Sequence, residues 1–229
     1  MVSSISFIQA KMQNIIAASG ILTRTVGVKR MDIASMQEPW YHENRIRGLN
    51  IPGYALYSAR GNEKPRASIL ARNLNAWVLP GFPCRDLVAI LIKYIEDGAE
   101  RRLVACSAYL SYDSENLPPS REMEEPVRYF DNENLRLIVG CDSTAHHTAW
   151  GCTNCNSRGE SLLEFLNSSN LEILNRGNEN TFCNVSRQEV FDITLGSYGL
   201  LGGVSGALPI GPYTYSVHST WLLPRGHEG

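Results

Sequence analysis

The 229-residue sequence has no long apolar run, no strong excess of one charge and no internal repeat. Its longest apolar stretches, residues 87–92 and 135–141, are far shorter than the ~20 residues that a membrane-spanning helix needs, so no membrane association is predicted. The first residues lack a basic segment followed by a long apolar one, and no signal peptide is expected. The formal net charge of −2 argues against a protein that holds nucleic acid by bulk charge alone, although it leaves a local basic groove open.

The composition is that of a globular chain. Apolar residues make up 43% of the sequence and charged residues 19%, which excludes a disordered, collagen-like or coiled-coil protein. The length suits one α/β domain with a full core.

Predicted strands outnumber predicted helices. β-branched and aromatic runs bounded by turn residues predict strands over residues 4–10, 31–37, 54–59, 67–71, 76–79, 87–94, 103–110, 135–141, 171–174, 181–183 and 189–195. Helical spacing predicts helices over residues 14–25, 120–134 and 157–168, with Ser120 as the cap of the second. Interspersed helices and many strands indicate an α/β domain of two packed sheets covered by helices.

The cysteines give little sign of a metal site. They lie at positions 84, 106, 141, 152, 155 and 183. Cys106 and Cys141 fall inside apolar runs, as small buried hydrophobic residues of a reducing compartment do. Cys152 and Cys155 form a CxxC pair, but no second pair follows at zinc-finger spacing, so two unlinked thiols are favoured over a zinc site.

Four polar residues stand where apolar strands end: Glu38, Tyr109, Asp142 and Asp192. A carboxylate at the end of a buried strand is costly unless it is paired, hydrogen-bonded or bound to a metal. Mg²⁺ prefers such hard oxygen ligands, completed by phosphate. For any one of these residues alone, a turn or cap carboxylate remains the alternative.

Two adjacent histidines, His146 and His147, follow the strand that ends at Asp142. They could ligate a metal or act as a general base. They could equally pack and hydrogen-bond as part of the loop.

Four motifs in order carry a resemblance to a known family. They are Met-Gln-Glu-Pro-Trp at 36–40, Cys-Ser-Ala-Tyr-Leu at 106–110, Gly-Cys-Asp-Ser-Thr-Ala-His-His-Thr-Ala-Trp-Gly at 140–151 and Phe-Asp-Ile-Thr-Leu-Gly-Ser at 191–197. Over roughly residues 4–206 the sequence resembles the endonuclease domain of arthropod non-LTR retrotransposons, in the endonuclease/exonuclease/phosphatase superfamily with deoxyribonuclease I. The resemblance implies a four-layer sandwich of two mixed β-sheets flanked by helices. It also implies a Mg²⁺-dependent nick in target DNA, with Mn²⁺ as the alternative ion, whose 3′-hydroxyl primes reverse transcription.

The resemblance also implies roles for single residues. Glu38 resembles the metal-binding glutamate, and Tyr109 the tyrosine that contacts the scissile phosphate. Asp142 resembles the aspartate that orients or deprotonates the attacking water or stabilises the leaving group. Asp192 resembles the late aspartate that supports the site, and Thr144 stands where the family has a catalytic asparagine. Such a site neutralises charge on the phosphodiester, positions a water and stabilises the leaving alkoxide.

The sequence departs from this family in three places. Lys11 replaces an asparagine that helps to hold the metal, and its charge would compete with Mg²⁺ for Glu38. Thr144 offers a hydroxyl where the family has an amide. The closing Ser-Asp-His of the family is missing, since His218 and His227 have no Ser-Asp before them. Losing one acid–base group typically lowers a rate about 10²–10⁴-fold.

The missing tripeptide suggests a frameshift. Residues 207–223, back-translated with suitable codons and read one nucleotide later, give Pro-Ser-Leu-Ser-Asp-His followed by an apolar strand. We therefore divide the chain into a nuclease-like domain at 1–206, short of its last strand, and an irregular, frameshifted tail at 207–229. The predicted protein is a degenerate, impaired endonuclease.

The partners expected from the resemblance are a DNA target strand and the reverse transcriptase domain of a larger polyprotein, in the nucleus. Arginines and lysines are spread over the chain, Arg66 and Arg158 among them, and most are expected on the solvated surface. Two alternatives are an inactive nucleic-acid-binding remnant and a phosphatase of the same superfamily.

Overall fold

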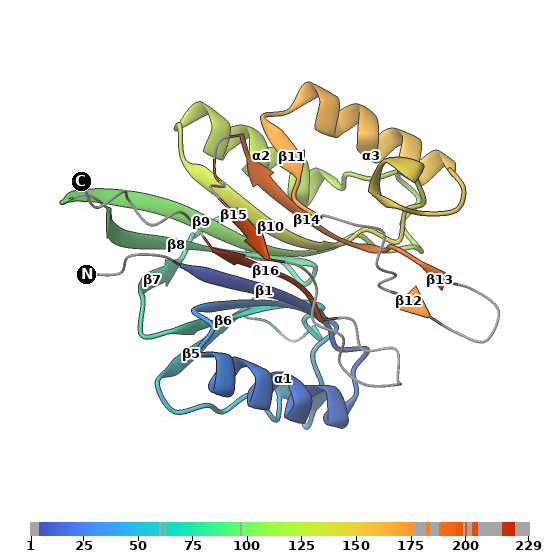
Figure 1. Cartoon of the computed structure of the whole chain (residues 1–229). Coiled ribbons are helices and arrows are strands. Elements are labelled where there is room, and N and C mark those ends of the chain that lie inside the picture. Colours follow the sequence, from blue (N-terminus) through green and yellow to red (C-terminus); the bar gives the residue numbers. More distant parts are fainter. Residues whose placement is uncertain are drawn as a thin grey trace.

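The computed structural model describes residues 5–59, 61, 63–96, 98–175, 182–183, 188–198, 200, 203–205 and 217–222. These form two stacked six-stranded sheets with helices on both outer faces (Figure 1). The predicted four-layer sandwich of mixed sheets is confirmed.

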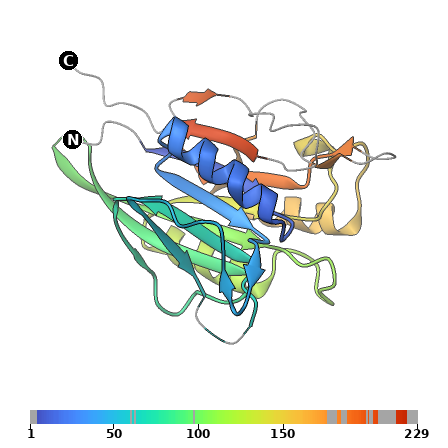
Figure 2. The same ribbon diagram turned by 90° about the horizontal axis from the view of Figure 1, so that it is seen from below.

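The first sheet has the order β15-β16-β1-β2-β6-β5. Its strands are β1 (Ser6–Lys11), β2 (Ile33–Gln37), β5 (Tyr54–Ser58), β6 (Ala67–Arg72), β15 (Gly203–Ser205) and β16 (Val217–Leu222). Helix α1 (Ile16–Lys29) lies along its outer face, as the view from below shows (Figure 2). Strands β1 and β2 are parallel, so both end at the same edge of the sheet.

The second sheet has the order β11-β14-β10-β9-β8-β7. Its strands are β7 (Asn75–Val78), β8 (Leu87–Glu96), β9 (Ala99–Tyr109), β10 (Arg136–Asp142), β11 (Leu171–Ile173) and β14 (Asp192–Ser197). Helices α2 (Arg121–Asn132) and α3 (Ser157–Ser168) cover its outer face (Figure 1). Two short hairpins complete the described strands, β3 (Tyr41–His42) with β4 (Arg45–Ile46) and β12 (Phe182–Cys183) with β13 (Gln188–Glu189).

Strand β8 shows why its sequence is a continuous apolar run. Val88 and Ile90 pack into the core between the two sheets, whereas Ala89 and Leu91 pack into the core under α2 and α3. A strand covered on both faces needs apolar residues at every position. A third core joins α1 to the first sheet through Leu22, Val26 and their neighbours.

A buried polar network lies between the sheets close to the site edge. The Gln37 amide donates to Ser35 Oγ at 3.0 Å, to Ser107 Oγ at 3.0 Å and to the Gly140 carbonyl at 2.9 Å. Gln9 Nε2 donates to Gln37 Oε1 at 3.3 Å. Because buried polar groups need partners, this network fixes the two sheets in one relative position.

The helices follow the prediction with shifts at their ends. Helix α3 has the predicted bounds, and its N-cap residue Asn156 accepts a hydrogen bond from Gly159 N at 2.8 Å. Ser120 occupies the N-cap position of α2, but its side chain makes no capping hydrogen bond. The strand predicted at 189–195 is divided, because Glu189 pairs within β13 and β14 begins only at Asp192.

The tail differs from the irregular segment expected at 207–229. Residues 217–222 form β16, which pairs antiparallel with β1 and with β15, so the edge of β1 is not left open. The backbone register sets Gln9 opposite His218. The rest of the tail lies outside the described residues. Among the described residues, no helix has the length and apolar character to span a membrane.

Candidate active site

Strand ends bring the predicted site residues to one edge of the sandwich. The register of β1 and β2 sets Lys11 beside Gln37, directly before Glu38. In the second sheet, Tyr109 lies beside Asp142 across the parallel pair of β9 and β10. A single edge of the two stacked sheets therefore collects residues from distant parts of the sequence.

An ion pair between the two sheets forms the centre of this edge. Lys11 Nζ lies 2.7 Å from Asp142 Oδ2 and 3.9 Å from Glu38 Oε2. The Asp142 side chain is fully buried, and that of Lys11 is 14% exposed. Burial raises the pKa of Asp142 to about 6, although Lys11 acts in the opposite direction. Burial alone would lower the pKa of Lys11, but the charges of Asp142 and Asp192 outweigh it, so the lysine is held protonated.

Glu38 is the more open carboxylate. Its side chain is 29% exposed, and its backbone has a left-handed φ of 51° directly after β2. Its N–H donates to the Arg66 carbonyl at 2.8 Å, which fixes the turn to the start of β6. Burial raises the pKa of Glu38, and Lys11 opposes the shift. Glu38 can thus offer oxygen atoms toward solvent, but only beside an ammonium group.

Tyr109 and Arg66 form one side of the site. The Arg66 guanidinium lies 4.5 Å from the centre of the Tyr109 ring and is ion-paired with Asp86. Arg66 Nη1 also donates to Ser111 Oγ at 3.1 Å. Burial, then the nearby charges of Glu38 and Asp142, raise the pKa of Tyr109, so its phenol keeps the proton it can donate. The arrangement combines a hydrogen-bond donor and a fixed positive charge, as phosphate recognition requires.

Asp192 lies on the other side of Asp142. The two aspartates are opposite each other in the antiparallel pair of β10 and β14, and Asp192 is buried. Asn175 holds this end of β14, since its Nδ2 donates to the Asp192 carbonyl at 3.1 Å and its Oδ1 accepts from Thr194 N at 2.6 Å. Asp192 is thus part of the buried charge cluster around Lys11.

Thr144 supports the loop after β10. Its Oγ1 donates to the Leu110 carbonyl at 2.8 Å and accepts from Arg158 Nη2 at 3.1 Å. Arg158 is buried and also donates to the Leu110 and Ser143 carbonyls, at 3.1 and 3.4 Å. Thr144 therefore uses its hydroxyl within the loop, and Arg158 is an internal support instead of a surface charge.

The histidines lie outside the carboxylate cluster. His146 is buried, its ring packs against Phe191, and its Nδ1 is 3.0 Å from Asn154 Oδ1. His147 accepts from Ala149 N at its own Nδ1. Both participate in loop structure, which was one of the two interpretations of the sequence.

The family model described as endonuclease-reverse transcriptase matches residues 103–206. Residues 103–206, a little under half of the chain, are thus similar to this family. The predicted resemblance to retrotransposon endonucleases is thereby confirmed. The match contains four of the predicted site residues, which are Tyr109, Asp142, Thr144 and Asp192.

Solved structures extend the likeness in fold to nearly the whole chain. The endonuclease domain of TRAS1, a telomere-specific non-LTR retrotransposon, superposes with a TM-score of 0.76 at 22% identity, covering 95% of this chain and 98% of that one. The catalytic domain of Xenopus laevis APE2 gives a TM-score of 0.64 at 14% identity, covering 98% and 94%. The human Nocturnin catalytic domain gives 0.61 at 14% identity, covering 97% and 96%. The sequence has no significant match among curated proteins.

The pairing of Lys11 with Asp142 and the place of Arg66 were missed at the level of sequence. Lys11 was expected beside Glu38, yet its shorter contact is with Asp142 on the other sheet. Arg66 stands directly before β6, which is the neighbour of β2. A basic residue between a loop and a predicted strand was the signal in the sequence that could have indicated a site residue.

Proposed function

We propose that this chain is the DNA-nicking domain of a non-LTR retrotransposon and that its phosphodiester-cleaving centre is impaired by Lys11. The family of residues 103–206 and the fold support a retrotransposon-type endonuclease domain. Phosphodiester chemistry is supported by the side chains that lie together at one edge of the two sheets, which are Glu38, Asp142, Tyr109 and Arg66. The proposed impairment depends on Lys11 Nζ, which lies 2.7 Å from Asp142 and 3.9 Å from Glu38.

Mg²⁺, the ion that the family resemblance implies, does not fit this site while Lys11 is in place. Mg²⁺ requires oxygen ligands at about 2.0–2.1 Å in near-octahedral geometry. The Lys11 ammonium already holds Asp142 and approaches Glu38, so a divalent ion at Glu38 would meet a fixed positive charge within a few ångströms. At an effective dielectric of 20, two such unit charges about 4 Å apart interact by about 4 kcal/mol, and a divalent ion doubles the repulsion. The lysine thus supplies the cluster with a cation of its own.

The remaining residues retain functions in binding. The Tyr109 phenol would donate to a non-bridging phosphate oxygen, and Arg66, held by Asp86, would add positive charge beside it. Asp192 and Asn175 would keep Asp142 in place. Because the net charge is −2, a local groove at this edge would have to hold the DNA target strand. The proposal also includes a reverse transcriptase domain in a larger polyprotein, and action in the nucleus.

Nicking of supercoiled plasmid in Mg²⁺, repeated in Mn²⁺, tests the proposal. The native chain should nick weakly, and Lys11→Asn should increase nicking by at least about tenfold, because it removes the competing charge and restores an oxygen ligand. Glu38→Ala in the Lys11→Asn background should abolish the gain. Lys93→Asn is the matched control, since Lys93 pairs with Glu100 on the exposed surface.

Other outcomes separate the alternatives. Robust nicking by the native chain that Glu38→Ala abolishes would overturn the impairment. DNA affinity without cleavage, even in Lys11→Asn, would favour a nucleic-acid-binding remnant, and release of phosphate from phosphomonoesters without nicking would favour a phosphatase. The coding DNA decides the frameshift separately, because a shifted frame without Ser-Asp-His excludes it.

A further inference from the structure

Two loop segments meet directly beyond the pair of strands that ends at Asp142 and Asp192. After β10, the chain continues through Ser143 toward a one-turn 3₁₀ helix at Thr148–Trp150. Before β14, the chain passes from β13 through Phe191. Ser143 N and Oγ both donate to the Phe191 carbonyl, at 2.9 and 2.8 Å. The two segments are therefore already in contact where they leave the sheet.

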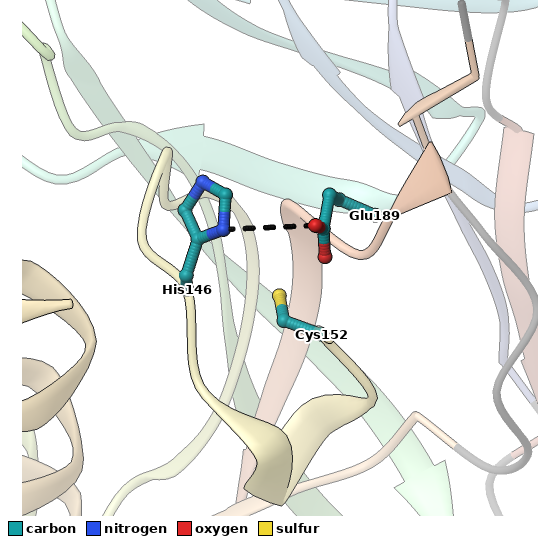
Figure 3. Close-up of side chains that lie close together, drawn as sticks. All are labelled: His146, Cys152 and Glu189. Carbon is teal, nitrogen blue, oxygen red and sulfur yellow. Dashed lines mark ion pairs between the residues drawn. The ribbon is translucent and has the colours of Figure 1, made fainter. Parts of the chain in front are cut away.

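Three potential metal ligands converge between these segments. A ring nitrogen of His146, the thiol sulfur of Cys152 and a carboxylate oxygen of Glu189 all lie within 4.8 Å of one another. The distance between His146 Nδ1 and Glu189 Oε1 is 4.0 Å. Figure 3 shows the three side chains pointing toward a common space from separate parts of the chain. All three residues are buried, with 8%, 5% and 2% of their surfaces exposed.

We propose that His146, Cys152 and Glu189 bind a Zn²⁺-class divalent cation. A set of one nitrogen, one sulfur and one oxygen ligand suits Zn²⁺, whereas Mg²⁺ and Ca²⁺ prefer oxygen alone. With Zn–N, Zn–O and Zn–S bonds of about 2.0, 2.1 and 2.3 Å, tetrahedral ligands of this set lie roughly 3.3–3.7 Å apart. The 4.0 Å between His146 Nδ1 and Glu189 Oε1 exceeds the roughly 3.4 Å expected for a nitrogen–oxygen pair by about half an ångström, which side-chain rotation can close. Asn154 Oδ1, 3.0 Å from His146 Nδ1, is a neutral oxygen near the fourth position. Because an amide oxygen can only accept, ligation through Nδ1 requires the proton of the neutral imidazole to move to Nε2, where solvent or protein can accept it.

Neighbouring groups hold the ligands in place. Thr153 N and Oγ1 donate to the two oxygens of Glu189, at 3.0 and 2.7 Å. The His146 ring packs on Phe191 with 4.8 Å between ring centres, and its backbone N–H donates to Asn156 Oδ1 at 3.1 Å. Such outer contacts orient metal ligands and reduce the cost of forming a site.

Binding requires one proton to leave the site. Cys152 Sγ donates to the Val190 carbonyl at 3.2 Å, and burial together with the charge of Glu189 raises its pKa. When the sulfur–metal bond forms, the thiol proton is released to solvent and this hydrogen bond is given up. The cation then faces one thiolate, one carboxylate and one neutral imidazole, and binding tightens as the pH rises.

A neighbouring group is the internal competitor. His147, Cys155 and Glu160 also bring ligand atoms within 4.8 Å of one another, but Cys155 and Glu160 are exposed. His147 Nδ1 is already occupied by Ala149 N at 3.0 Å. The CxxC pair is thus divided, with Cys152 in the buried group and Cys155 in the exposed one.

The proposed cation would link the loop after β10 to the segment before β14. That loop carries Thr144 and is anchored by Arg158, so a metal at His146 would stiffen the support of the Asp142 edge. Helix α3 can lie this close to the loop at His146 because residue 159 is a glycine. A Cβ built on Gly159 would lie 2.6 Å from the carbonyl carbon of His146 and would clash with it. The expected effect is a rise in melting temperature with metal concentration.

Titration of the full chain with Co²⁺, a coloured probe for Zn²⁺ sites, tests the proposal. One equivalent should bind with a thiolate-to-cobalt charge-transfer band and tetrahedral d–d bands, and Zn²⁺ should displace it. Cys152→Ser should remove the charge-transfer band, and Glu189→Gln should weaken binding at least about tenfold. Cys155→Ser is the matched control and should retain the band.

Two results would overturn the proposal. The first is the absence of a charge-transfer band in the native chain. The second is a band that disappears in Cys155→Ser and persists in Cys152→Ser, because it would place the metal at the exposed group. Because Cys152→Ser could fail to fold, release of stoichiometric Zn²⁺ from the native chain on thiol modification, with a matching fall in melting temperature, provides an independent measurement. Glu38→Ala must leave the cobalt signal unchanged, so this result does not depend on nicking.

Discussion

Gly140 of β10 and Ser35 of β2 face each other across the two sheets with no room for a side chain between them. A Cβ on Gly140 would lie 2.7 Å from Ser35 Cβ and would clash with Ser35 Oγ. The Gly140 carbonyl also accepts from the Gln37 amide at 2.9 Å. The close approach of the sheets at this point is what allows Lys11 of one sheet to reach Asp142 of the other.

Gly140→Ala should therefore destabilise the fold by about 1–3 kcal/mol, since an extra methyl group in a tight core forces neighbours to move. Urea unfolding monitored by circular dichroism measures the change. Gly20→Ala is the control, because Gly20 lies in α1 with nothing within 4 Å of a new Cβ, and should stabilise by up to about 1 kcal/mol. Equal effects of the two substitutions would contradict the close approach.

Removing the Lys11 charge should destabilise the protein in a pH-dependent way. Burial raises the folded-state pKa of Asp142 to about 6, above its unfolded value, so its contribution to stability falls as the pH rises through this interval. Lys11→Met removes the charge that opposes this shift, so the pKa of Asp142 rises further. The loss of stability then continues to higher pH than in the native chain. The variant should be less stable than the native chain by about 3 kcal/mol at about pH 7.5 and by much less at about pH 5.

Urea unfolding at both pH values measures this difference. Lys93→Met is the control, because Lys93 forms an exposed pair with Glu100, and it should cost less than about 1 kcal/mol at either pH. A loss in Lys11→Met that is the same at both pH values would indicate lost packing and not an unpaired carboxylate.

The two helix caps should respond differently to alanine. Asn156 Oδ1 accepts from Gly159 N at 2.8 Å and from His146 N at 3.1 Å, so Asn156→Ala should cost about 1–2 kcal/mol. Ser120 makes no side-chain capping bond, and Ser120→Ala should stay within about 0.5 kcal/mol. Thermal and urea unfolding of the two variants test the contrast, and a larger loss in Ser120→Ala would reverse the assignment.

Much of the fold could be predicted because its strands carry strong local signals. The alternation of Val88, Ala89, Ile90 and Leu91 between two cores requires an unbroken apolar run, which is visible in sequence. Strand-end carboxylates such as Asp142 are visible for the same reason, since each interrupts such a run. The hairpin of β3 and β4 has strands too short for any periodic pattern.

What the sequence could not predict are contacts across the sheets. The Gln37 network and the Lys11–Asp142 pair join residues on different sheets, and no local spacing records how the sheets stack. The grouping of His146, Cys152 and Glu189 was not predicted, because the CxxC spacing favours two unlinked thiols and indicates no partner for Cys152. The true neighbour, Glu189, lies in a strand that sequence reasoning had merged with β14.

Substitutions of Thr144 test whether this position tolerates the asparagine that the resemblance to retrotransposon endonucleases implies there. Its φ of 45° is left-handed, which is costly for a β-branched residue and much less so for asparagine. Its hydroxyl nevertheless bonds Leu110 and Arg158, so Thr144→Val, which keeps the strain and removes both bonds, should cost about 1–3 kcal/mol. Thr144→Asn relieves the backbone and keeps an oxygen that can accept from Arg158, and its stability in urea should equal or exceed that of the native chain. A loss in Thr144→Asn as large as in Thr144→Val would mean that the hydroxyl, and not the backbone, decides this position.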